Sequence, residues 1–123
     1  MTMAATSVPH ELQEKYKKVE DLARQLRNMT ATLRMVQENL EQLENTLARL
    51  EETPEDARIF ESIGSFLVET EKSKAVAKLR EQIEKYRAYI KGLKKRIKEA
   101  EKEYNTLAQE LITRETAPPT TAG

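Results

Sequence analysis

Residues 53–76 read TPEDARIFESIGSFLVETEKSKAV and differ in composition from the sequence on either side. This segment gathers β-branched and aromatic residues around Gly64 and Ser65, whereas the flanking sequence is rich in Ala, Glu, Lys, Leu and Arg. Val, Ile and Phe favour strands, and Gly followed by Ser suits a two-residue type II′ turn. The segment therefore predicts a β-hairpin over residues 58–70, with strands at about 58–63 and 66–70.

Side-chain alternation divides the apolar residues of the predicted hairpin between its two faces. Glu61 shares a face with four apolar residues, whereas Phe60 and Leu67 lie on the other face. A lone two-stranded hairpin is marginally stable and has two unpaired edges, so we expect it to join strands of other subunits. A local cap folded onto its own helices is the alternative. The residues expected at this oligomerisation interface are Ile59, Phe60, Ile63, Phe66, Leu67 and Val68.

The sequence on each side of the hairpin carries apolar residues at alternating spacings of three and four, with Lys15 as the one polar occupant. This period is typical of a helix that packs along another helix. We predict helices over residues 8–52 and 72–113 that pair as a long antiparallel coiled coil. The seam positions are Val8, Leu12, Lys15, Val19, Leu22, Leu26, Met29, Leu33, Val36, Leu40, Leu43, Leu47 and Leu50, then Val76, Leu79, Ile83, Tyr86, Ile90, Leu93, Ile97, Ala100, Tyr104, Leu107 and Leu111.

Helix-start and helix-stop signals give the predicted boundaries. Ser7 is a suitable N-cap, and Thr53 followed by Pro54 stops the first helix because the residue before proline avoids the helical region. Residues 1–7 are predicted to be a flexible N-terminus, and residues 114–123 a disordered tail rich in Pro and Thr. The chain is thus expected to be mainly α, with one coiled-coil and hairpin domain over residues 8–113.

Composition excludes several classes of protein. The 123 residues are 34% charged and 5% aromatic, with no Cys and a net charge of +0. Without Cys there are no disulfides, thiolate zinc sites or cysteine nucleophiles, and the single His10 has no partners at metal-ligand spacing. We therefore expect no enzyme activity, no catalytic residue, no cofactor and no metal. The N-terminus lacks the features of a signal peptide and no segment suits a membrane span, so we expect a cytoplasmic protein without a membrane partner.

Charge is distributed unevenly along the chain. Residues 72–103 hold twelve Lys or Arg against five Glu, whereas residues 38–61 hold two Arg against eight acidic residues. The basic run includes Lys91, Lys94, Lys95, Arg96 and Lys98 but has no interleaved aromatic residues to stack on bases. We interpret it as a solvated face and expect no nucleic-acid partner. Binding of nucleic-acid phosphates and attraction of an acidic partner protein are the alternatives.

A predicted helix, the segment TPEDARIFESIGSFLVETEKSKAV and a second predicted helix follow one another along the chain. This arrangement resembles the β-type subunits of the prefoldin family over about residues 8–113. The α-type subunits carry two hairpins, and this connector has room for one. The resemblance implies a heterohexamer of two α-type and four β-type subunits, whose hairpins assemble into a central double β-barrel. It also implies an ATP-independent molecular chaperone that captures non-native polypeptides at the coiled-coil tips. Such chaperones deliver their clients to a group II chaperonin, the double-ring cytosolic type.

The open end of the coiled coil is the expected client-binding tip, because helix ends fray and lack neighbours that complete the seam. Tyr16 and Ile112 lie outside the seam positions there. For the candidate residues at seam positions, the alternative is ordinary packing within the coiled coil. The candidate residues are Val8, Leu12, Tyr16, Tyr104, Leu107, Leu111 and Ile112.

A different class of function stays open on the sequence alone. The chain would then be a structural coiled-coil spacer or tether that oligomerises through its hairpin and binds one specific partner. Suppression of the aggregation of an unrelated denatured protein distinguishes the two hypotheses, because a tether has no reason to slow it.

Overall fold

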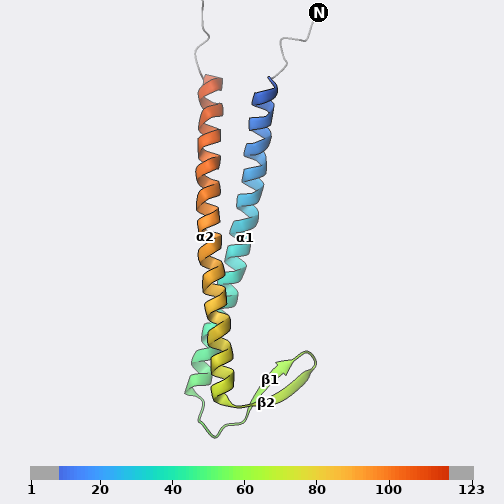
Figure 1. Cartoon of the computed structure of the whole chain (residues 1–123), viewed down its shortest axis with the longest axis vertical. Helices are drawn as coiled ribbons and strands as arrows, with labels where there is room; N and C mark the ends of the chain where they lie inside the picture. The colour runs from blue at the N-terminus through green and yellow to red at the C-terminus, as the bar shows by residue number, and fades with distance from the viewer. Residues whose placement is uncertain (1–8, 117–123) are drawn as a thin grey trace, which may run out of the picture. The chain divides into compact units, whose positions relative to one another are not determined.

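A computed structural model describes residues 9–116. Within them, helix α1 spans His10–Glu52, strand β1 Ile59–Ile63, strand β2 Phe66–Thr70 and helix α2 Lys72–Thr116 (Figure 1). The predicted fold class is confirmed, since two long helices are joined by a two-stranded antiparallel hairpin. Val8, Ser7 and the predicted flexible N-terminus lie outside the described residues, as does most of the predicted tail.

Two helix boundaries differ from the predicted ones by two or three residues. α1 begins at His10 rather than at residue 8, because the carbonyl of Pro9 accepts the first helical hydrogen bond, from the N–H of Gln13 at 3.0 Å. α2 continues to Thr116 rather than ending at residue 113. The first proline of the tail is Pro118, so the residue whose helical conformation it disfavours is Ala117, which lies beyond the end of α2.

The chain divides into two compact units. The hairpin unit spans Thr32–Lys94 and contains the hairpin with the adjoining parts of both helices. The terminal unit combines residues up to Ala31 with residues from Lys95 onward. In each unit a segment of α1 packs against a segment of α2, and each is described separately below.

The predicted seam is where side chains are shielded from solvent. All described seam positions, Lys15 included, are buried or half-buried. The buried apolar side chains are Leu22, Ala100 and Leu111 in the terminal unit and Val36, Ile83, Ile90 and Leu93 in the hairpin unit. None of the described side chains is large and completely enclosed. A core this thin is characteristic of a helix pair, in which most of each helix surface contacts water.

The helices run antiparallel within each unit. In the terminal unit Lys15 pairs with Glu110 at 3.1 Å and Lys18 with Glu103 at 2.9 Å. In the hairpin unit Arg87 pairs with Glu44 at 3.9 Å and Arg80 with Glu51 at 2.9 Å. In both cases the partner's number falls along α2 as the number rises along α1, which is the order that an antiparallel pair requires.

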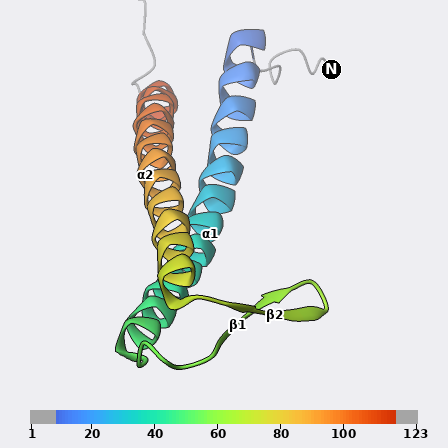
Figure 2. The same cartoon turned by 60° about the horizontal axis from the view of Figure 1, so that its bottom comes forward.

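The hairpin has the predicted turn and register. Gly64 has a φ of 59°, and no other described residue has a positive φ, so the turn is type II′ rather than type I′. Ile59 pairs with Thr70, Glu61 with Val68, and Ile63 with Phe66. Paired residues share a face, so the predicted face of Ile59, Glu61, Ile63, Phe66 and Val68 is confirmed. Figures 1 and 2 both show the hairpin projecting to one side of the helix segments that adjoin it.

Candidate functional site

The hairpin is the most exposed apolar surface of the described residues. Phe66 and Leu67 are 73% and 72% exposed, and Phe60, Ile63 and Val68 are also exposed. Ile59, at the base of β1, is half-buried. Exposed apolar side chains therefore occur on both faces, and the hairpin does not fold onto its own helices as the alternative interpretation supposed. A clustered apolar surface of this kind marks an interaction site.

The backbone of the hairpin is also incomplete as a sheet. The sheet consists of β1 and β2 alone, so each strand has one edge without a neighbouring strand among the described residues. Unpaired N–H and C=O groups at such an edge readily accept a further strand. Apolar faces and open edges occur together here, which suits pairing with strands of other subunits.

An ion pair explains the charged residue on the more apolar face. Glu61 accepts a hydrogen bond from the ammonium group of Lys78 on α2. The side chain of Glu61 is consequently half-buried, while apolar neighbours nearer the turn stay exposed. The pair fastens the middle of β1 to α2, so Glu61 orients the hairpin rather than weakening its apolar surface.

A second polar cluster lies on the opposite face. The guanidinium group of Arg58 donates to both carboxylate oxygens of Glu69, at 3.1 and 3.3 Å. The same group lies 5.3 Å from the ring centroid of Phe60. Paired and stacked in this way, Arg58 links the start of β1 to the end of β2 and holds the Phe60 ring in place.

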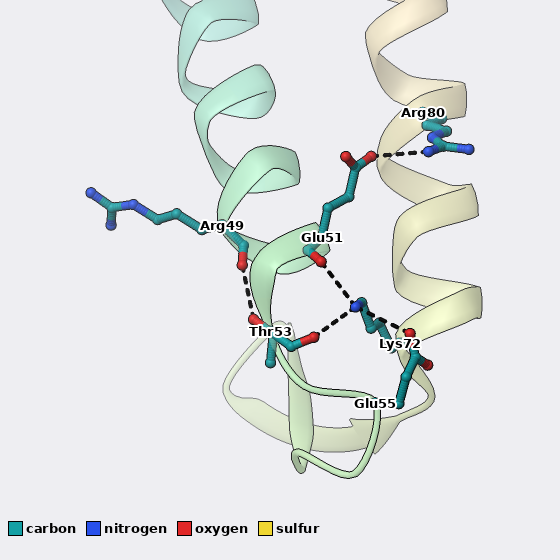
Figure 3. A network of polar contacts seen from close by, with 6 residues as sticks. All are labelled: Arg49, Glu51, Thr53, Glu55, Lys72 and Arg80. Carbon is teal, nitrogen blue, oxygen red and sulfur yellow. Dashed lines mark hydrogen bonds and ion pairs between the residues drawn. The ribbon is translucent and has the colours of Figure 1, made fainter.

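Lys72 anchors the base of the hairpin, as Figure 3 shows. Its ammonium group donates to the backbone carbonyls of Glu51 at 3.0 Å and Thr53 at 2.6 Å, and to the Glu55 carboxylate at 3.2 Å. The Thr53 hydroxyl in turn donates to the Arg49 carbonyl at 2.8 Å. Lys72, the first residue of α2, thus satisfies one of the last carbonyls of α1 and the carbonyl directly after that helix. Sequence analysis missed this role of Lys72, because Lys72 is far from Glu51 and Thr53 in the sequence.

The candidate tip residues belong to the terminal unit. Leu12, Tyr16, Tyr104 and Leu107 are half-buried, Leu111 is buried and Ile112 is exposed. Leu111 therefore packs in the seam, whereas the apolar side chain of Ile112 is exposed to solvent. A groove of about 790 Å³ in this unit is lined by polar side chains such as Lys15, Asn105 and Gln109, so the apolar candidates do not line it.

Two ion pairs connect α1 with α2 in the terminal unit. Lys15, the polar occupant of the seam, is half-buried and reaches Glu110, which explains how the seam accommodates a charge. Lys18 is bound by Glu103, whose hydrogen bond and negative charge raise the pKa of the lysine. Surface pairs of this kind contribute little individually, so apolar contacts carry most of the pairing.

The described residues contain no candidate metal site. His10 is a surface residue that pairs with Glu14 at 3.0 Å, and within the described part no three His, Asp or Glu side chains are placed to bind a metal. Neither described helix contains an apolar stretch long enough to cross a membrane.

Comparison with known proteins identifies the family. The sequence profile of the family described as "Prefoldin subunit" matches residues 13–115. The chain is 29% identical to prefoldin subunit beta of Thermococcus gammatolerans over 108 residues, which cover 88% of this chain and 89% of that protein. It is 27% identical to the same subunit of Thermococcus kodakarensis, covering 93% of this chain and 97% of that protein.

A solved structure agrees with these sequence matches. The prefoldin beta subunit from Thermococcus strain KS-1 superposes with a TM-score of 0.82 and 26% identity, over 92% of this chain and 98% of that one. Its description, the names of the relatives and the single hairpin of the described residues all agree with the β-type class. The chain therefore belongs to the prefoldin family, as a β-type subunit.

Proposed function

We propose that this chain is a subunit of an ATP-independent molecular chaperone, which captures non-native polypeptides and delivers them to a group II chaperonin. Family membership supports a chaperone role. The observation that carries the proposal is the exposed hairpin, with five large apolar side chains in contact with solvent and two open strand edges. Such a surface needs strands from other subunits to cover it.

The proposed assembly is a hexamer of two α-type and four β-type subunits in the cytoplasm, built by pairing of the hairpins into a β-barrel. Clients then bind at the tips of the coiled coils, where Ile112 is exposed and Leu12, Tyr16, Tyr104 and Leu107 are only half-buried. Leu111 is buried in the helix pair there, and Val8, the remaining candidate residue, lies outside the described residues. Apolar contact is non-directional, so one surface can hold many unfolded sequences without catalysis or a cofactor.

The first experiment is the native mass of the complex isolated from its own cells, with each subunit identified by mass. A hexamer that includes a second, two-hairpin type of subunit supports the proposal. A homodimer, or a complex with a single unrelated protein, contradicts it and favours a tether.

The second experiment tests capture at the tips. A complex whose β-type chain lacks residues 1–16 and 104–123 is expected to assemble but to suppress aggregation of a denatured protein poorly. Removal of residues 1–9 and 117–123 alone, which spares both described helices, is the control. If the complex that lacks residues 1–16 and 104–123 suppresses aggregation as well as the full-length complex does, the client-binding site lies elsewhere.

A further inference from the structure

Helix α2 contains a stretch of positive side chains that bind no carboxylate. Between residues 72 and 87, every basic side chain of α2 except Lys74 forms an ion pair. Between residues 91 and 102, by contrast, no basic side chain pairs with another described residue, and all are exposed. These unpaired side chains are Lys91, Lys94, Lys95, Arg96, Lys98 and Lys102.

Three of these lysines form a row along one face of α2 in the terminal unit. Lys95, Lys98 and Lys102 follow one another at spacings of three and four, so successive members are neighbours on the helix surface. None of them occupies a seam position, and all three contact solvent. Lys91 comes four residues before Lys95 and extends the same spacing along the helix. We call these four lysines the basic row.

The basic row is unfavourable for the helix that carries it. Like charges at spacings of three and four repel one another and destabilise a helix. Glu99 lies four residues after Lys95 and three before Lys102, but its carboxylate forms an ion pair with neither. A solvated face that balances its own charges, as elsewhere along α2, does not explain this arrangement. An uncompensated conflict with a local rule is instead typical of a functional surface.

The surroundings of the basic row favour an acidic protein over a nucleic acid. Glu99 and Glu101 lie on the same turns of α2, and their charges oppose a duplex that carries one negative charge per about 1.7 Å of its axis. No aromatic residue occurs between residues 91 and 102 to stack on a base. A helix with carboxylates at spacings of three and four has the same rise as the lysines, about 5 Å from one charge to the next. It can therefore place one carboxylate against each lysine.

We propose that the basic row, Lys91, Lys95, Lys98 and Lys102, is a docking surface for an acidic helix of a partner protein, which carries its carboxylates on one face. The inference goes beyond the proposed capture of clients, because the row is polar and contains none of the hairpin or candidate tip residues. The partner is recognised by charge and spacing, and it need not be unfolded.

Two peptides test the recognition of spacing. Both are fluorescent, helical, rich in alanine and glutamine, and identical in composition, with four glutamates each. The first peptide places its glutamates at spacings of four, three and four, and the second at spacings of five, which distribute them around the helix. By fluorescence anisotropy at low ionic strength, the assembled complex is expected to bind the first peptide roughly tenfold more tightly. Equal affinities would overturn the proposal.

Charge reversal tests the location of the surface. Lys95→Glu with Lys98→Glu is expected to weaken binding of the first peptide at least roughly tenfold. The control, Lys17→Glu with Arg27→Glu, makes the same change in net charge at exposed positions of α1 in the same unit, and is expected to lose much less affinity. Equal losses in the two variants would mean that only net charge matters, and would overturn the proposal.

Neutral substitution separates loss of binding from loss of folding. Lys95→Gln with Lys98→Gln removes the repulsion within the row, so its denaturant midpoint is expected to equal or exceed that of the unaltered complex. Binding of the first peptide is nevertheless expected to weaken. Unchanged binding by this variant would contradict a role of these lysines in docking.

Two further measurements exclude other occupants. A short DNA duplex is expected to bind more weakly than the first peptide, and tighter binding of the duplex that Lys95→Glu with Lys98→Glu abolishes would assign the row to nucleic acid and overturn the proposal. The same variant is expected to suppress aggregation of a denatured protein as the unaltered complex does. Loss of suppression would assign the row to client capture instead. If the unaltered complex binds the peptide through the row but suppresses no aggregation, the proposed function fails while the docking surface stands.

Discussion

The ammonium group of Lys72 lies 2.6 Å from the backbone carbonyl oxygen of Thr53, to which it donates a hydrogen bond (Figure 3). A lysine as the first residue of a helix is unfavourable for that helix, whose amino end is already electropositive. Here the charge lies at the carboxyl end of α1, where the dipole favours a cation and the last carbonyls need donors. This hydrogen bond thereby joins the two ends of the segment between α1 and α2, which contains the hairpin.

Replacement of this lysine tests the anchor. Lys72→Met removes a donor that serves three oxygens while only 14% of its side chain is exposed, so we expect the free energy of unfolding to fall by about 1–3 kcal/mol. Urea denaturation followed by circular dichroism measures the change. Lys74→Met, at an exposed position of the same helix turn, is the control and is expected to be near neutral. Equal stability of the two variants would contradict the anchoring role.

The two described internal glycines predict opposite effects of one substitution. Gly64 has a positive φ, so Gly64→Ala is expected to destabilise the hairpin by about 1 kcal/mol. Gly92 lies inside α2, so Gly92→Ala is expected to stabilise the chain by about 1 kcal/mol through helix propensity. An added Cβ meets no atom within 4 Å at either site, so backbone conformation alone accounts for both effects. Shifts of the denaturant midpoint in the same direction for both variants would refute this account.

A charge on the hairpin is expected to break the assembly. Ile63→Asp or Phe66→Asp places a carboxylate on an exposed apolar side chain that we expect to be covered by partner strands. Native mass measurements are expected to show loss of the hexamer, while helix content stays high. Ser65→Asp in the turn adds the same charge outside the paired strands and is the control. An intact hexamer with Asp at position 63 or 66 would rule out the interface.

Exchange of two charges tests whether Glu61 orients the hairpin. Glu61→Lys or Lys78→Glu alone creates a like-charge contact between β1 and α2, and each is expected to lower the yield of hexamer. The double variant restores opposite charges and is expected to recover most of that yield. The effect on stability itself is expected to be below about 1 kcal/mol, as for other surface pairs. If the double variant assembles no better than either single variant, the pair has no orienting role.

Alkaline pH is expected to loosen the terminal unit. The pKa of Lys18 is raised above the usual lysine value of 10.5 by the hydrogen bond from its ammonium group to Glu103 and by the charge of that residue. A raised pKa means that the stabilisation is complete below the unfolded value and is lost as pH rises through the folded value. Circular dichroism between about pH 9 and about pH 12 measures the loss. Lys18→Met is expected to remove this part of the pH dependence, whereas Lys17→Met, at an exposed neighbouring position, is expected to retain it.

The helices, the hairpin and its register could be read from local sequence. Spacings of three and four specify which face of a helix is buried, and the seam residues from Leu12 to Leu111 are indeed the shielded ones. Alternation about Gly64 and Ser65 specifies the strand faces in the same way, because a two-residue turn leaves a single register. These features depend on residues close together in the chain, so periodicity suffices to predict them.

Contacts between distant residues could not be predicted in this way. Lys72 with Thr53, and Lys78 with Glu61, each join residues 17 or more positions apart, and many lysines and acids of this chain were equally plausible partners. In the hairpin unit, Met35 of α1 and Tyr89 of α2 line one groove although they are far apart in the sequence, because both lie on the same flank of the seam. Their positions outside the seam were a usable signal, but only the packing of one helix on the other brings them together. Local periodicity thus specifies the elements, whereas the angle of the hairpin and the chemistry of each flank arise from packing in three dimensions.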